Sequence, residues 1–290
     1  MDKKKLKKLI YAFGKGIGFV ALIYILYKLS QEYTLNEFLA KFKSIKSFLV
    51  PLIIINLLSS IIGIYAWHLM LLEYAKKSFN YISSFYYFAK TEISKYLPGN
   101  IFHFVGRQAL ASKLNISQVD MAKISLLFTI SLMVATIISS TILAIFVSNI
   151  AIYLKLLMVL ASIVALLLIY FSYPIISKKT KAKTTAILTF SISLQGVMLA
   201  LIVYAQVDTL NLEQFLKIAS AYIISWLIGF ITPGASGGLG VREGAFLAIA
   251  NFIHLNISNE VILFSILLIR LINILVDILM FLSTLLLNKE

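Results

Sequence analysis

The sequence predicts an all-α integral membrane protein, a polytopic helical bundle, and three observations lead to that prediction. Of its 290 residues, 60% are hydrophobic, and the mean hydropathy is +0.95. Only 13% are charged, whereas soluble domains carry about 25% charged residues. Six apolar stretches each reach the length of about 20 residues that a bilayer-crossing helix needs. Because no stretch is long and polar enough for a soluble catalytic domain, we expect residues 1–290 to form a single transmembrane domain.

The apolar stretches give the predicted full spans. In chain order these are residues 9–29, 48–72, 123–148, 151–173, 184–206 and 260–287. The lysine-rich N-terminus resembles the start of a signal peptide, but no small-residue cleavage site follows and the apolar run continues to Leu29. We therefore interpret residues 9–29 as an uncleaved first span with its N-terminus inside.

Two further segments, residues 79–113 and 215–255, each contain a proline–glycine break. The breaks are Pro98, Gly99, Pro233 and Gly234. The first segment also holds Lys90, Glu92 and Lys95, which make it too polar for a helix facing lipid. Irregular backbone at membrane depth is tolerated only where protein buries it or where it lines a polar cavity. The sequence therefore predicts two re-entrant helical hairpins.

The two hairpins belong to a predicted repeat, residues 48–148 and 184–287, joined by the linking span 151–173. Nine residues separate Pro98 from Arg107 and Pro233 from Arg242, and Leu-Asn-Ile-Ser closes both hairpins at 114–117 and 255–258. We expect this tetrapeptide to cap the helix that follows. Because each copy crosses the membrane an even number of times and one span links them, the copies should be inverted. Inverted repeats with broken helices are typical of alternating-access transporters.

The charge distribution predicts the orientation. The chain has 26 basic and 12 acidic residues, and most lysines fall in segments 1–8, 73–122 and 174–183. A net charge of +14 here indicates cytoplasmic loops near anionic lipid rather than a nucleic-acid partner. We expect a multi-pass protein of a bacterial or archaeal cell membrane with both termini in the cytoplasm. The absence of cysteine excludes disulfides and thiolate chemistry.

The second hairpin carries the strongest candidate site. Its glycines, Gly237, Gly238 and Gly240, allow backbone to approach a ligand closely, and the start of a half-helix attracts anions. Arg242 could bind phosphate through two hydrogen bonds. The alternative is that the glycines only permit a tight turn and that Arg242 and Glu243 neutralise each other. The glycine spacing fits no dinucleotide fingerprint and no Walker lysine follows, so we expect no cofactor.

Four other residues complete the predicted substrate-binding set: Arg107, Arg270, Asn273 and Asp277. Arg107 is the counterpart of Arg242, although it could equally be an arginine at the cytoplasmic interface. The other three share one face of the last span. Arg270 lies about 15 Å inside that span, where a charge costs roughly 3 kcal/mol unless it is satisfied. This face must look into the protein, either to contact a ligand or to form a structural polar clamp. No metal-ligand spacing or Ser-His-Asp arrangement is present, so we expect neither a metal nor a catalytic triad.

These motifs resemble a known family. Lys95-Tyr-Leu-Pro-Gly with Gly106-Arg107, then Pro233-Gly-x-x-Gly-Gly-Leu-Gly-Val-Arg-Glu-Gly, then Arg270 in the last span, are similar to the lysylphosphatidylglycerol synthase transmembrane-region family. That family includes the flippase part of the bacterial multiple peptide resistance factor. The resemblance covers residues 10–285 and implies a bundle with re-entrant helices that moves a lipid between leaflets. The resistance factor also has a soluble aminoacyl transferase domain, which this sequence does not show, so we expect no synthesis of lysylphosphatidylglycerol.

The sequence leaves three functions open. The first is a flippase or transporter for an anionic or lipid-linked substrate, either a phospholipid or a polyprenyl phosphate. The second is an integral-membrane transferase acting on a polyprenyl-phosphate-linked substrate, with Glu243 as its base. The third is a non-transporting scaffold for envelope assembly. All three imply membrane lipids as partners, and homo-oligomer formation stays open.

Overall fold

The computed structural model describes residues 35–75, 80–96, 102–148, 150–171, 176–207, 209–232, 238 and 240–287, and these form helices and short connections. The helices are α2 (Leu35–Ala75), α3 (Tyr81–Glu92), η1 (Ile93–Tyr96), α4 (Phe102–Leu110), η2 (Ala111–Leu114), α5 (Gln118–Ile145), α6 (Ile152–Phe171), α7 (Lys178–Tyr204), α8 (Leu212–Ile231), α9 (Val241–Phe252) and α10 (Asn259–Leu286). The elements η1 and η2 are short 3₁₀ turns.

Six of the described helices are long and apolar enough to cross a membrane, which confirms a polytopic helical membrane protein. They are Ile45–Tyr74, Gln118–Ile145, Ile152–Phe171, Lys178–Tyr204, Leu212–Ile231 and Asn259–Leu286. Five of them overlap predicted spans. The sixth, α8, is 20 residues long where the sequence predicted only one arm of a hairpin. The predicted span 9–29 and the breaks at Pro98, Gly99, Pro233 and Gly234 lie outside the described residues.

Four of the described long helices, α5, α7, α8 and α10, begin at side-chain caps. Ser117 caps α5 by accepting a hydrogen bond from the backbone N–H of Asp120, and Ser258 caps α10 in the same way through Val261. These two serines end the repeated Leu-Asn-Ile-Ser, so the predicted capping role belongs to its serine. Such caps satisfy backbone donors that the first turn leaves unpaired.

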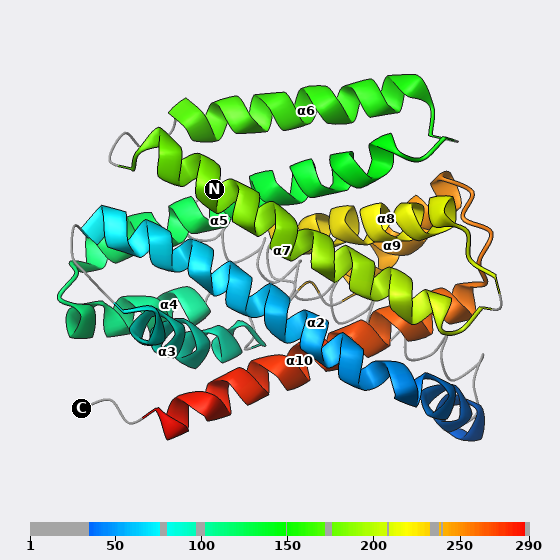
Figure 1. The fold of residues 1–290 in the computed structure, drawn as a ribbon, viewed down its shortest axis with the longest axis horizontal. Coiled ribbons are helices and arrows are strands. Elements are labelled where there is room, and N and C mark those ends of the chain that lie inside the picture. Colours follow the sequence, from blue (N-terminus) through cyan, green and yellow to red (C-terminus); the bar gives the residue numbers. More distant parts are fainter. Residues whose placement is uncertain are drawn as a thin grey trace, which may run out of the picture.

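In Figure 1, α2 and α7 lie side by side through the middle of the molecule, with α3 and α4 toward one end and α8 and α9 toward the other. The helix α6 lies at the edge, against α5 and α7. The observed helix contacts have a regular form. Exchanging α2 with α7, α3 with α8, α4 with α9 and α5 with α10 converts the contacts α2–α3, α3–α4, α4–α5 and α3–α10 into α7–α8, α8–α9, α9–α10 and α8–α5, all of which are present.

Small polar residues join the crossing helices. The hydroxyl of Ser59 donates to the carbonyl oxygen of Ser191 at 2.8 Å, and that of Ser191 donates to the carbonyl oxygen of Ser59 at 2.8 Å. Ser140 on α5 and Ser220 on α8 make a similar reciprocal contact, with their hydroxyls 2.9 Å apart. Lipid provides no hydrophobic force between helices, so small residues that permit close approach and hydrogen bonding favour association.

The tightest such approach is at Gly196 of α7. A Cβ atom added there would lie 2.7 Å from Cδ1 of Ile223 and 2.8 Å from the backbone oxygen of Ala219, both on α8. We expect Gly196→Ala to destabilise the protein by about 1–3 kcal/mol, because the added methyl overlaps a backbone atom that cannot rotate away. Thermal unfolding of the detergent-purified protein measures this.

Gly244 on α9 provides the matched control, since nothing lies within 4 Å of a Cβ added there. Gly244→Ala should leave the unfolding temperature unchanged or raise it slightly, as alanine favours helix over glycine by about 1 kcal/mol. Equal unfolding temperatures for the two variants would contradict the close α7–α8 contact.

Candidate functional site

A cavity of about 230 Å³ lies among the helices and is lined by residues of α2, α3, η1, α4, α5, α7, α8, α9 and α10. Six charged side chains line it: Glu92, Lys95, Arg107, Arg242, Arg270 and Asp277. The entire sequence contains three arginines, and all three are in this set. Charged groups in an apolar bundle are costly, so such a concentration in one place points to a site rather than to chance.

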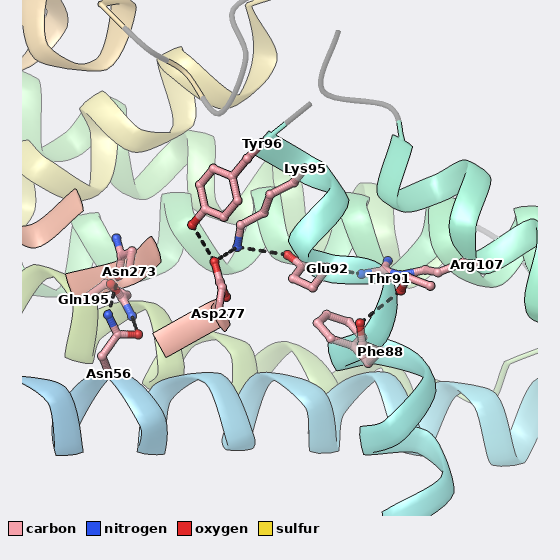
Figure 2. A network of polar contacts seen from close by, with 10 residues as sticks. All are labelled: Asn56, Phe88, Thr91, Glu92, Lys95, Tyr96, Arg107, Gln195, Asn273 and Asp277. Atoms are coloured by element: carbon pink, nitrogen blue, oxygen red, sulfur yellow. Dashed lines mark hydrogen bonds and ion pairs between the residues drawn. The ribbon is translucent and has the colours of Figure 1, made fainter. Parts of the chain in front are cut away.

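An ion-pair network joins the first short helices to α10 (Figure 2). The ammonium of Lys95 lies 2.8 Å from Oδ2 of Asp277 and 3.2 Å from Oε1 of Glu92. The hydroxyl of Tyr96 donates to the same Oδ2 of Asp277 at 2.5 Å. Arg107 completes the network through Nη2, which lies 2.8 Å from Oε2 of Glu92. Lys95 therefore connects two carboxylates that are far apart in the sequence.

The titration of the groups on the short helices follows from these contacts. Burial raises the pKa of Glu92, but the cations of Lys95 and Arg107 outweigh burial and bring it to about 2. Burial lowers the pKa of Lys95, yet Asp277 and Glu92 outweigh it and raise that pKa above its usual value. Burial lowers the pKa of His103 to about 4, so its imidazole is neutral at pH 7. Glu92 and Lys95 are therefore both charged at pH 7, and they pair beside a neutral His103.

Arg107 is enclosed by aromatic rings and is only 4% exposed. Its guanidinium lies 4.2 Å from the ring centroid of Phe88, and the rings of Trp67, Phe104 and Phe128 lie within about 6 Å. Guanidinium groups are attracted to aromatic faces, most strongly where water is excluded. This enclosure holds Arg107 in place against Glu92, so Arg107 is a buried group and not a solvent-exposed one.

The second half of the site is built around α9. Glu243 forms an ion pair with Arg270 of α10. Its carboxylate therefore connects α9 to α10. The guanidinium of Arg242 lies 5.7 Å from the ring of Trp226 and hydrogen-bonds Tyr222, both on α8. Trp226 in turn stacks on Phe230 with centroids 5.0 Å apart. These contacts place Arg242 and Arg270 at the same cavity.

Glycine makes the α8–α9 contact possible. Gly238 has φ of +72°, and a Cβ added there would lie 3.2 Å from backbone atoms of Gly229 on α8. Gly240, which precedes the first turn of α9, has φ of +78°. Both conformations favour glycine. In the described structure, these two glycines shape the backbone that presents Arg242, and neither lines the cavity.

Uncharged polar groups form another wall of the cavity, also visible in Figure 2. Asn56 on α2 donates to the side-chain oxygen of Asn273 on α10, and Gln195 on α7 donates to Asn56 at 3.4 Å and to Ser59 at 3.1 Å. Three long helices therefore meet through amide groups beside the charged network.

The structure brings together most of the predicted site residues. Arg107, Arg242, Arg270, Asn273 and Asp277 line one cavity, and Glu243 reaches it through Arg270. Gly237 lies outside the described residues. The sequence did not predict Tyr96, Asn56 or Trp226 as site residues. It identified Glu92 and Lys95 as charges too polar for a lipid-facing helix, and Lys95 as the start of the first Pro-Gly motif, but neither as a site residue. Comparison with models of known protein families gives no match for this chain, and a search of curated proteins finds no match either.

The ion network makes Glu92 a sensitive position. We expect Glu92→Gln to destabilise the protein by about 3 kcal/mol, because it leaves Arg107 buried without its carboxylate. Thermal unfolding in detergent checks this. Lys90→Gln on the same helix is the control, since Lys90 bonds only the neighbouring Tyr86 hydroxyl among the contacts described for it. Similar unfolding temperatures for both variants would show that the network does not stabilise the fold.

Proposed function

We propose that this protein is a membrane transporter, a flippase that moves an anionic or lipid-linked substrate with a phosphate group between leaflets. The observation that carries this proposal is the gathering of all three arginines of the chain around one cavity. The planar guanidinium matches phosphate geometry and binds it with two parallel hydrogen bonds, which an ammonium cannot do. A phosphate headgroup with a net negative charge fits this lining better than a zwitterionic or uncharged headgroup.

The helix arrangement supports transport by alternating access. We propose that residues 48–148 and 184–287 are inverted repeats and that α3–α4 and α8–α9 are re-entrant hairpins. The exchangeable contact pattern of the two sets of helices supports this interpretation. Transporters of this kind place their substrate site where the two repeats meet, and the cavity is lined by helices of both sets.

The family resemblance leads to the same proposal. The Pro-Gly and Arg motifs resemble those of the lysylphosphatidylglycerol synthase transmembrane-region family, for which lipid movement between leaflets is the implied activity. We also propose that the protein lies in the cell membrane of a bacterium or archaeon. The distribution of lysines among its loops favours an orientation with both termini in the cytoplasm.

A transferase acting on a polyprenyl-phosphate-linked substrate is the second candidate. One observation favours it: Oε2 of Glu243 is buried and accepts no hydrogen bond from the described residues, so it could take a proton. Against it, Oε1 of the same carboxylate is already held in an ion pair with Arg270.

Purified protein in liposomes tests the proposal. Movement of fluorescent anionic, zwitterionic and polyprenyl-phosphate lipids between leaflets should be selective for phosphate-bearing anionic headgroups. Arg242→Ala and Arg270→Ala should each slow the initial rate roughly tenfold or more, because a hydrogen bond to a charged group contributes about 1.5–3 kcal/mol.

Lys179→Ala is the matched control, since this exposed lysine near the start of α7 lies away from the cavity. It should keep the wild-type rate. Wild-type rates in the two arginine variants would refute transport through this cavity. Conversion of a polyprenyl-phosphate substrate that depends on Glu243, without lipid movement, would favour the transferase.

A further inference from the structure

The three carboxylates at the cavity differ in the number of cations with which they form ion pairs. Glu92 contacts both Lys95 and Arg107, and Glu243 has Arg270. Asp277 has one cation among the described residues, Lys95, and it shares this cation with Glu92. Its other polar contact is the neutral hydroxyl of Tyr96. Asp277 is therefore the carboxylate whose charge is least securely balanced.

The charges around the cavity also set how much negative charge it accepts. Lys95, Arg107, Arg242 and Arg270 give four cations, and Glu92, Glu243 and Asp277 give three carboxylates, which leaves one positive charge in excess. A singly charged phosphodiester would bring the count to zero. A doubly charged phosphate, such as a monoester, would leave one negative charge too many in a buried, poorly solvated site, where unbalanced charge is costly.

We propose that Asp277 takes up one proton when a doubly charged phosphate group binds in this cavity, so that transport of such a substrate is coupled to protons. In this step the carboxylate of Asp277 accepts a proton from water and becomes neutral. The ammonium of Lys95 is then released from Asp277 and turns its charge to the phosphate. This inference rests on the proposed function, because it takes the cavity to be the phosphate site.

The surroundings of Asp277 single it out. From η1 it contacts Lys95 and Tyr96, and from α3 Glu92 shares the cation of Lys95 with it. The helix α9 contributes Arg242 and Glu243 to the same site, and Arg270 lies two turns earlier on α10 itself. The residues of α2 and α7 that line the cavity, such as Asn56 and Gln195, do not titrate. When Lys95 turns to the ligand, Glu92 still has the cation of Arg107, whereas Asp277 loses its ion-pair partner. Asp277 is therefore the group that accepts the proton.

The proposal is tested by calorimetric titration of the detergent-purified full chain at pH 8 in two buffers with different ionisation enthalpies. The probes are a short-chain phosphatidic acid, a short-chain phosphatidylglycerol and sodium sulfate. Phosphatidic acid is mostly doubly charged at this pH, since the second phosphate pKa is about 6, whereas phosphatidylglycerol carries one charge. The difference between buffers should show about one proton taken up per phosphatidic acid bound and about none for phosphatidylglycerol.

Sulfate distinguishes the source of the ligand. If sulfate binds and about one proton is taken up, a free dianion is sufficient as ligand. If phosphatidic acid binds but sulfate does not, the lipid portion is required. Both results support the proposal when the binding of phosphatidic acid is accompanied by the uptake of one proton. Binding of phosphatidic acid by the wild-type protein without proton uptake would overturn it.

Asp277→Asn should bind phosphatidic acid with no proton uptake, whereas Glu260→Gln, at the exposed start of the same helix, should keep the wild-type proton count. Persistent uptake in Asp277→Asn would also overturn the proposal. If that variant does not fold, Tyr96→Phe replaces it: removing a hydrogen bond that favours the charged carboxylate should move the midpoint of proton uptake to higher pH, and an unchanged midpoint would count as refutation. Movement of phosphatidic acid between leaflets without proton uptake would refute only this inference, whereas failure of all three probes to bind would refute the proposed function with it.

Discussion

The structure depends on how an apolar helical bundle accommodates its charged side chains. A charge at membrane depth must be paired or hydrogen-bonded, and here the pairing crosses between elements far apart in the sequence. Lys95 on η1 joins Glu92 to Asp277, and Arg270 on α10 holds Glu243 on α9. The last helix is thus tied to both sets of short helices by ion pairs, so the need to pair these charges helps to position the short helices around the cavity.

The remaining helix contacts are of a different kind. Hydroxyl pairs join α2 to α7 and α5 to α8, while Gly196 lets α7 approach α8 closely. Such contacts keep their strength whatever the protonation state of the cavity. The bundle therefore combines uncharged contacts between its long helices with ion pairs at the cavity. A ligand or a proton can change the ion pairs without changing the uncharged contacts.

The sequence was sufficient for the membrane class, for five of the six described spans and for the shared face of Arg270, Asn273 and Asp277, because these depend on local hydropathy and helical periodicity. It predicted α8 as one arm of a hairpin because small and polar residues reduce the hydropathy of this helix, and α8 also has the length and composition of a spanning helix. It could not identify Lys95 as the partner of Asp277, since 182 positions separate them and no local pattern links a lysine to a distant aspartate. For the motif glycines the sequence left open both close approach to a ligand and a tight turn, and Gly238 and Gly240 have the positive φ values of a turn before α9.

The reciprocal contact between Ser59 and Ser191 has a mechanical consequence. Each hydroxyl bonds the other residue's carbonyl oxygen at the same distance of 2.8 Å, so a rocking motion that interchanged the roles of α2 and α7 would leave this contact unchanged in energy. The contact between Ser59 and Ser191 therefore favours neither of the two conformations that such a motion would connect. In the transport cycle proposed above, an energetic preference for one of the two conformations would come from contacts that have no such counterpart, and the ion pair of Lys95 with Asp277 is one of them.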